Sequence, residues 1–302
     1  MKKQLIVISD MEGASGIFDS DLELVINGSE KWRKFGREKM TSDVLAVCEA
    51  ANEFGIDEIL YYDAHFAGNP EFNVIIEKLP WNVRLFDTPD RCFDWRRIRG
   101  QAQTNPFGLI TVGQHARNGE ENAYFPHTIQ SPPIKGLWIN DMHIAEIGMA
   151  VLSFQGVKYI ANIGCEASRK EAKELSEKVK HISVKDKSKG WEPGVEETYA
   201  IIKDGVLEAL KNSKESESVV LEAPYTFKLE LCKHYYFQEP KEISWKGEFT
   251  KKEAIWEAPS VEIGLELFNF VRNHIRADED DTKQKQRRST SVNGIEQDRG
   301  TE

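Results

Sequence analysis

The stretch Leu5-Ile6-Val7-Ile8-Ser9-Asp10-Met11-Glu12-Gly13 decides how the rest of the chain is interpreted. Its four leading apolar residues, most of them β-branched, predict a short buried strand. The strand runs into a loop, residues 10–16, that holds two carboxylates and two glycines. Because ligands in an open α/β sheet bind beyond the carboxyl ends of the strands, we expect Asp10 and Glu12 at a functional site. For this stretch alone, a solvated loop is an equally simple explanation.

The same arrangement recurs twice along the chain. A strand predicted over residues 58–62 ends in Asp63-Ala64-His65, and a strand over 108–113 leads into Gln114-His115-Ala116-Arg117. Strands and helices alternate, which favours an α/β fold with a mostly parallel sheet flanked by helices. The apolar patterns also predict helices over 30–54, 143–154, 166–178, 195–211 and from 260 onward, and strands over 83–86, 135–139, 159–163, 219–231 and 242–256.

A helix beginning near His143 has a simple start signal. Asn140 or Asp141 is expected to cap it, which places Glu146 one turn inside the helix.

The last third of the chain changes character and predicts a smaller C-terminal α+β lobe. We therefore expect three parts: an α/β metal-binding catalytic domain over residues 1–190, the smaller lobe over 191–276, and a disordered tail over 277–302. The tail is almost wholly polar, so it buries too little apolar surface to offset the entropy of ordering.

Composition excludes several classes of protein. The chain has 302 residues, of which 40% are hydrophobic and 30% charged, as in an ordinary globular protein. Its net charge of -10 argues against a partner that is nucleic acid or an anionic membrane surface. There is no apolar run of membrane-spanning length and no signal-peptide pattern. The four cysteines lack any C-x-x-C spacing, which indicates reduced thiols and a cytoplasmic location.

Carboxylates and imidazoles at corresponding strand or helix ends predict a metal centre. The candidates are Asp10, Glu12, His65 and His115, joined by Glu146. This donor set, without thiolates, suits zinc, manganese or iron and is typical of hydrolytic sites. An aspartate can bridge two metals that together activate water and polarise a carbonyl or phosphoryl oxygen.

Asp63 has a different expected role. It precedes His65 by two residues, and we expect it to orient His65 rather than to bind metal. Any one of these histidines alone is more often a structural residue than a ligand.

The same residues carry a resemblance to a known family. Ser9-Asp10-Met11-Glu12-Gly13-Ala14-Ser15-Gly16 resembles the opening motif of the zinc D-aminopeptidases of the DppA type. Asp63-Ala64-His65, Gly113-Gln114-His115-Ala116-Arg117 and Ile139-Asn140-Asp141 followed by Glu146 and Gly148 resemble further blocks of that family, in the same order and with similar gaps. The resemblance covers roughly residues 4–275.

The resemblance implies a metallo-aminopeptidase with two zinc ions per chain, although manganese or another divalent metal also suits the donors. Asp10 would bridge the two ions. Glu12 and His65 would complete the coordination shell of one ion, and His115 and Glu146 would complete that of the other. It also implies a homo-oligomer that forms a ring around a channel, with a decamer as one expected size. The substrate would be a short peptide with a free amino terminus, D-amino-acid peptides included.

His127 aligns with the catalytic histidine of the family, to which the resemblance assigns a nucleophile role. From chemistry alone, a general base or a transition-state donor is equally open, because an imidazole exchanges protons near neutral pH. An exposed loop histidine is the plain alternative.

The chain departs from the family pattern at three places and keeps the metal ligands. The loop from His115 to His127 is one residue longer, which bears on whether His127 reaches the site. Gly164-Cys165-Glu166 replaces a G-D-D block, and residues 186–191 follow Val184-Lys185 without the family's arginine. The last two departures are expected to shape the substrate pocket.

Two other functions stay open at this point: a metal-dependent phosphoesterase, and a catalytically silent oligomer stabilised by metal. The retained His127 speaks against the silent oligomer.

Four histidines match no motif and are expected to be structural or exposed: His143, His181, His234 and His274.

Overall fold

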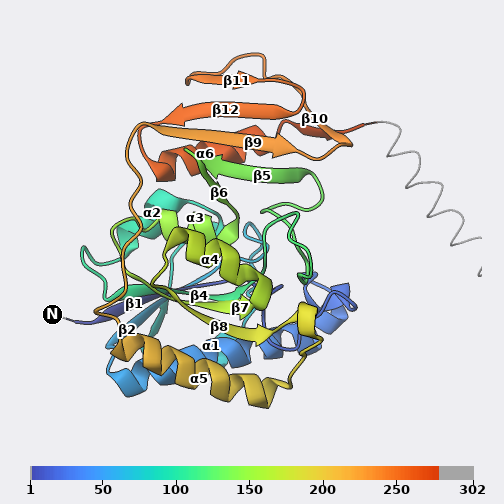
Figure 1. Cartoon of the computed structure of the whole chain (residues 1–302). Helices are drawn as coiled ribbons and strands as arrows, with labels where there is room; N and C mark the ends of the chain where they lie inside the picture. The colour runs from blue at the N-terminus through green and yellow to red at the C-terminus, as the bar shows by residue number, and fades with distance from the viewer. Residues whose placement is uncertain (1, 279–302) are drawn as a thin grey trace, which may run out of the picture.

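A six-stranded parallel sheet forms the centre of the structure, a computed structural model that describes residues 2–278 (Figure 1). The strand order is β3-β2-β1-β4-β7-β8, and every neighbouring pair is parallel. The strands are β1 Gln4–Ser9, β2 Glu58–Asp63, β3 Val83–Leu85, β4 Gly108–Gln114, β7 Tyr159–Cys165 and β8 Lys180–Lys185. The order changes direction between β1 and β4, which is where such sheets bind ligands.

β1 lies at the middle of the sheet and is buried on both faces. Leu5 and Val7 pack toward α1 (Arg37–Phe54) and α5 (Val195–Lys211), while Ile6 and Ile8 belong to the core on the opposite face. This follows from the strand period of two, which sends successive side chains to opposite faces.

Three helices cover the second face: α2 (Trp95–Gln101), α3 (Glu146–Leu152) and α4 (Arg169–Leu175). Beyond them lies a five-stranded antiparallel sheet, drawn at the top of Figure 1, in the order β11-β12-β9-β5-β6. Its strands are β5 Ile134–Ile139, β6 Met142–Ile144, β9 Tyr225–Leu231, β11 Gly247–Phe249 and β12 Glu253–Ala258. The short strands β10 (Tyr235–Phe237) and β13 (Ile275–Ala277) pair beside it.

One apolar core joins the two sheets. In β9 and β12 alternate residues are buried, and this face packs on α6 (Val261–Arg272). The rings of Phe227 and Trp256 stack 5.3 Å apart within that core, which also contains Ile6 and Ile8 of the parallel sheet. The antiparallel lobe therefore buries its apolar surface against the first sheet's helices, and this burial stabilises both lobes together.

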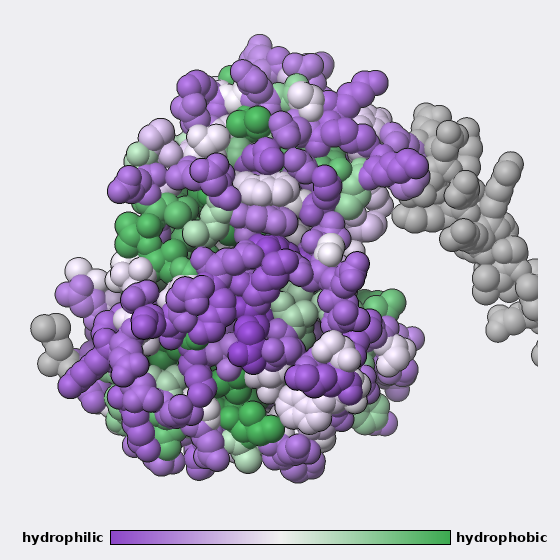
Figure 2. All heavy atoms as spheres, viewed as in Figure 1, coloured by the Kyte–Doolittle hydropathy of each residue, from purple (hydrophilic) through white to green (hydrophobic). Residues whose placement is uncertain are grey.

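The outer surface matches the composition. The face seen in Figure 2 is mainly hydrophilic, with smaller apolar patches. Among residues 2–278, no helix combines the length and the apolar character that a membrane crossing requires.

The predicted fold class is confirmed: a mostly parallel sheet flanked by helices, with a smaller α+β lobe. The helix over 195–211 has the predicted bounds, and the helix predicted over 30–54 includes a wider turn at Trp32–Gly36 before α1. The strand predicted from residue 219 begins only at Tyr225.

The helix predicted from His143 is wrong at its start. His143 lies in β6, and Asn140 and Asp141 form the two-residue turn of a β5–β6 hairpin. Asn140 adopts a left-handed conformation, with φ of 54°, and its amide binds the backbone of Thr226 and Glu222 instead of capping a helix. Glu146 is consequently the first residue of α3 rather than one turn inside a helix.

The predicted division at residue 190 stays a prediction. In the structure, α5 packs against α1 beneath the parallel sheet, and β5 and β6 belong to the antiparallel sheet, so the two lobes alternate along the chain. Ala277, the expected start of the tail, is the last residue of β13 and pairs with Tyr235 of β10. Residues 279–302 of the predicted tail lie outside the described residues.

Candidate metal centre

Four of the predicted site residues follow three neighbouring strands and lie at one edge of the parallel sheet. Asp10 and Glu12 follow β1, His65 follows β2 by two residues, and His115 follows β4 directly. All four are buried. The rule that parallel strands present their carboxyl ends at one edge therefore brings these side chains together.

Two glycines allow the loops after β1 and β4 to pack backbone against backbone. Gly13 N–H donates to the carbonyl of Gly113 over 2.9 Å. Gly113 has φ of +70°, and a Cβ there would lie 2.1 Å from the Asp10 carbonyl oxygen. A Cβ on Gly13 would lie 1.8 Å from the Gln114 carbonyl oxygen. Any side chain at either position would push Asp10 away from His115.

The His65 ring is oriented by a backbone carbonyl. Its Nε2–H donates to the Val25 oxygen over 2.7 Å. Its Nδ1 then points inward, 3.2 Å from Asp10 Oδ1 and 2.9 Å from Glu12 Oε2.

The His115 ring is also oriented by a backbone carbonyl, but through Nδ1 instead of Nε2. Nδ1–H donates to the Ala116 oxygen over 2.8 Å. Nε2 lies 3.2 Å from Asp10 Oδ2 and 3.5 Å from Glu146 Oε1. Because the outward nitrogen of each ring donates to a carbonyl, the inward nitrogen carries a lone pair.

The imidazole nitrogen lone pairs thus face carboxylate oxygen lone pairs across the site. These groups repel one another unless a proton or a cation lies between them. Within the described residues, four side-chain atoms of the site are buried without a hydrogen-bond partner: Asp10 Oδ2, Glu12 Oε2, His115 Nε2 and Glu146 Oε2. Donor atoms of Asp10, Glu12 and His115 lie within 4.8 Å of one another. Carboxylate and imidazole donors at this spacing fit a divalent cation such as zinc.

The electrostatics of the site lead to the same conclusion. Burial would lower the pKa of His115, but Glu146 and Asp10 raise it well above the ordinary value. The pKa of His65 is raised in the same way, because Glu12 and Asp10 outweigh the burial effect. Burial would raise the pKa of Asp10, but the two histidines hold it well below its usual range. The site therefore favours positive charge, which metal ions supply without protons.

The β5–β6 hairpin leads directly to Glu146. Glu146 Oε1 accepts from Ile129 N–H over 2.6 Å, which ties α3 to the preceding loop. Glu171 on α4 caps the start of α3, since its Oε1 accepts from the N–H groups of Ala145 and Gly148 at 2.7 and 3.0 Å. Burial raises the pKa of Glu171 to about 7.

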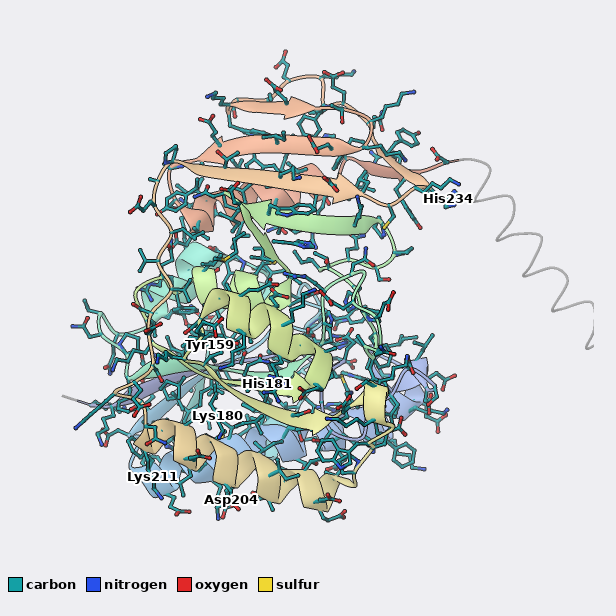
Figure 3. All side chains as sticks on the ribbon, viewed as in Figure 1. Tyr159, Lys180, His181, Asp204, Lys211 and His234 are labelled. Carbon is teal, nitrogen blue, oxygen red and sulfur yellow. The ribbon has the colours of Figure 1, made fainter. Side chains whose placement is uncertain are left out.

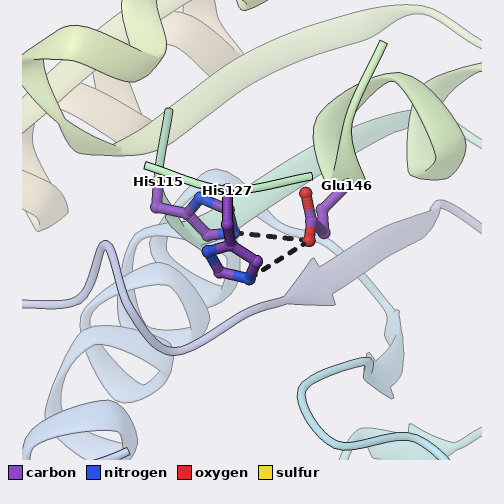
Figure 4. Close-up of side chains that lie close together, drawn as sticks. All are labelled: His115, His127 and Glu146. Carbon is purple, nitrogen blue, oxygen red and sulfur yellow. Dashed lines mark ion pairs between the residues drawn. The ribbon is translucent and has the colours of Figure 1, made fainter. Parts of the chain in front are cut away.

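His127 reaches the site despite the longer loop. Its ring stacks on that of His115, with centroids 4.0 Å apart and planes 8° apart (Figure 4). Nδ1–H donates to the Phe125 oxygen over 2.8 Å, so the Nε2 lone pair faces Glu146 Oε1 at 3.5 Å and Glu12 Oε1 at 3.9 Å. By distance alone, His115, His127 and Glu146 also form a possible ligand group.

Asp63 acts on the backbone of His65 rather than on its ring. The Asp63 carboxylate accepts from Asn73 N–H at 2.6 Å and from Asn73 Nδ2 at 2.9 Å. Asn73 and Arg91 each donate to the His65 carbonyl over 2.8 Å. The sequence gives no signal for Asn73, Arg91 or the Val25 carbonyl, because these contacts come from loops without periodic patterning.

Lys185 lies beneath the metal-binding loop. Its buried ammonium group donates to the carbonyls of Glu12 and Ala14 at 2.8 and 2.9 Å, and also to that of Ile17. Burial lowers the pKa of Lys185 to about 8. Three carbonyl acceptors match the three N–H donors of an ammonium ion, so Lys185 holds the loop that carries Glu12.

Lys185→Met should lower the free energy of unfolding by roughly 3 kcal/mol, because it leaves buried carbonyls without a donor. Thermal or urea unfolding of the purified variant measures this. Lys180→Met is the matched control, since Lys180 lies on the same strand (Figure 3) but pairs with Glu208 at the surface. The control should change stability by less than about 1 kcal/mol. Equal stability of the two variants would contradict this role for Lys185.

Of the four histidines outside the motifs, three have structural contacts, since His274 Nδ1 lies 3.0 Å from the Phe270 carbonyl oxygen. His181 on β8 (Figure 3) accepts from Asn162 Nδ2 at 3.0 Å, and burial lowers its pKa to about 3. His143 stacks on Trp138 at 4.3 Å, and burial lowers its pKa to about 4. His234 lies in the antiparallel lobe (Figure 3).

A cavity of about 470 Å³ opens onto the donor cluster. Asp10, Glu12, His65, His127 and Glu146 line one part of it. Most of the remaining wall is apolar, with contributions from Leu22, Phe66, Phe93, Trp95, Phe125, Ile129 and Met149. This size and lining suit a small, partly apolar ligand.

Comparisons with known proteins agree with this site and fold. The D-aminopeptidase family model matches residues 4–262. Among solved structures, the chain is similar to the Zn-dependent D-aminopeptidase DppA from Bacillus subtilis, a self-compartmentalizing protease, with a TM-score of 0.76 and 20% sequence identity, covering 90% of this chain and 97% of that one. The comparison with curated proteins gave no match. The predicted family is confirmed: this chain belongs to the D-aminopeptidase family.

Proposed function

We propose that the chain is a zinc-dependent aminopeptidase that holds two ions and cleaves short peptides with a free amino terminus, D-amino-acid peptides included. Membership of the D-aminopeptidase family supports the reaction. The structural neighbour is itself zinc-dependent, which supports the choice of metal.

The observation that carries the proposal is the position of Asp10 between two histidines. Its Oδ1 lies 3.2 Å from His65 Nδ1, and its Oδ2 lies 3.2 Å from His115 Nε2. One carboxylate thus faces two separate imidazole lone pairs, as a bridging ligand must. Glu12 is next to His65, and Glu146 is next to His115, so each histidine has its own carboxylate.

When bound, the ions would supply Lewis acidity at the scissile carbonyl and lower the pKa of a bound water. His127 supplies the proton transfer. Its Nε2 lone pair, set by the hydrogen bond from Nδ1 to Phe125, accepts a proton from the attacking water as the new C–O bond forms. The same nitrogen returns the proton to the leaving amine as the C–N bond breaks. The lone pair also suits a nucleophile, the role that the family resemblance implies.

The walls of the cavity favour a peptide over a phosphate ester. Apolar side chains such as Phe93, Trp95 and Met149 suit amino-acid side chains, whereas a phosphoryl group needs several cationic or N–H donors. The place of His127 beside the donors supports a working catalyst over a silent metal-stabilised oligomer.

A metal and substrate screen tests the proposed function. Elemental analysis of the purified protein should find about two divalent ions per chain. Chelation should abolish hydrolysis of D- and L-dipeptides, and zinc or manganese should restore it. p-Nitrophenyl phosphate is the control substrate. Turnover of the phosphate ester alone, or of no substrate by the metal-loaded protein, would refute the proposal.

Assembly and location are part of the same proposal. We infer a homo-oligomer, for which a decamer is the expected size, supported by the self-compartmentalizing neighbour and by exposed apolar side chains such as Phe35 and Trp81. All four cysteines are free, which supports the cytoplasm as the location.

A further inference from the structure

An arginine from the antiparallel lobe lines the same cavity as the donor cluster. Arg272 is the last residue of α6, and its half-buried side chain contributes to the wall that also includes Glu12, His127 and Glu146. Different elements therefore supply different chemistry to one cavity: the loops after the parallel strands supply Asp10, Glu12 and His65, and α6 supplies a guanidinium.

Arg272 has no partner, unlike every other arginine in residues 2–278. The others each have a hydrogen bond or an ion pair with a carbonyl or carboxylate of the chain. Arg272 makes neither within that part of the chain; its guanidinium carbon, Cζ, lies 5.8 Å from the ring centroid of Phe268. Burial lowers the pKa of Arg272.

Two carboxylates that share a second cavity with Arg272 are already engaged. Asp94 and Glu266 line a second cavity that Arg272 also touches. Glu266 binds the guanidinium of Arg96, and Asp94 Oδ1 accepts from Arg97 N–H at 3.0 Å as the cap of α2. A partly buried cation without a partner costs free energy, so its position on the cavity wall indicates an anionic ligand.

We propose that Arg272 binds the C-terminal carboxylate of the substrate peptide, so that the enzyme acts on short peptides whose carboxyl end is free. The inference rests on the proposed aminopeptidase function. Guanidinium and carboxylate match as a bidentate pair, with two parallel N–H···O bonds. The cavity of about 470 Å³ then limits the length of peptide that fits between the reacting carbonyl and the C-terminal carboxylate.

The test compares one short peptide as the free acid and as its C-terminal amide. The amide keeps the amino terminus, the scissile bond and the side chains, and removes only the negative charge. For the wild type, kcat/KM should be about 10- to 100-fold higher for the acid, the range for a hydrogen-bonded charge pair. Arg272→Gln should bring the ratio close to one, and Arg272→Lys should give an intermediate ratio.

Arg276→Gln is the matched control, because Arg276 lies just beyond α6, on β13, and donates to the carbonyls of Asn273 and Ile275. It should keep the wild-type ratio. A wild-type ratio near one would overturn the inference, whether or not any variant folds. A wild-type ratio retained in a folded Arg272→Gln protein would overturn it as well.

Failure of the proposed function has a different signature. If neither peptide is hydrolysed, the reaction is wrong, and calorimetric binding of the same acid and amide decides the role of Arg272. Tighter binding of the acid, lost in Arg272→Gln, supports the anion site. Equal binding of both peptides, or binding of neither, overturns it.

Discussion

Asp10→Ala should yield a folded protein that has lost nearly all of its metal and at least about 10³-fold in kcat/KM. Both oxygens of Asp10 face imidazole lone pairs, so its removal would take a ligand from both of the proposed ions at once. Loss of a two-metal clamp would remove several kcal/mol of transition-state stabilisation, and each 1.4 kcal/mol is tenfold in rate. Elemental analysis and steady-state kinetics on D-dipeptides measure the two effects.

Two further variants make this result specific. Asp10→Asn keeps the shape of the side chain and should still lose most of the metal, because the amide is a poor bridging ligand. Asp43→Asn is the matched control: Asp43 is a buried carboxylate under the same loop, where it accepts from Ser15 N–H over 2.9 Å. The control should keep its metal. Unchanged metal content in Asp10→Ala would refute the bridging role.

The second large effect is expected for His127→Ala, which should keep its metal and its fold while kcat falls by roughly 10²–10⁴, the range for a general acid–base group. In the proposed mechanism the Nε2 lone pair moves the proton in the transition state, so KM should change little. A covalent nucleophile would give a larger loss. Kinetics, elemental analysis and a melting curve together separate catalysis from ligation.

His143→Ala is the control for this variant, since His143 stacks on Trp138 in the hairpin and matches no site motif. It should keep near wild-type kcat. Loss of metal from His127→Ala would identify the ring as a ligand, as its 3.5 Å distance from Glu146 also permits. Near wild-type kcat in His127→Ala would remove the residue from the mechanism.

The sequence predicted the centre of the site because local rules govern it. Apolar runs mark β1, β2 and β4, and the residues that follow a parallel strand lie at one edge of the sheet. Asp10, His65 and His115 could therefore be placed together without distances. The orientations of the His65 and His115 rings could not be predicted. The Val25 and Ala116 carbonyls that fix them are backbone groups, which every residue carries.

The start of α3 shows the opposite case. Asn140 and Asp141 suit both a helix cap and a hairpin turn, so local preference does not choose between them. The choice is made by β9, whose Phe227 pairs with Ile139 and whose Thr226 binds the Asn140 side chain. Such pairing across more than 80 positions has no local signal. Arg272 was missed for the same reason, since only the packing of α6 reveals it.

The place of β5 between β6 and β9 also has a consequence for folding while the chain is being synthesised on the ribosome. The six parallel strands have all been synthesised once Lys185 has been added, yet β5 still lacks its long neighbour, Tyr225–Leu231. The hairpin that leads into Glu146 gains that neighbour only when β9 emerges. A nascent chain therefore carries Asp10, His65 and His115 well before the hairpin that leads into Glu146 has its last neighbouring strand, and the antiparallel side of the peptide-cleaving centre is completed only late in synthesis.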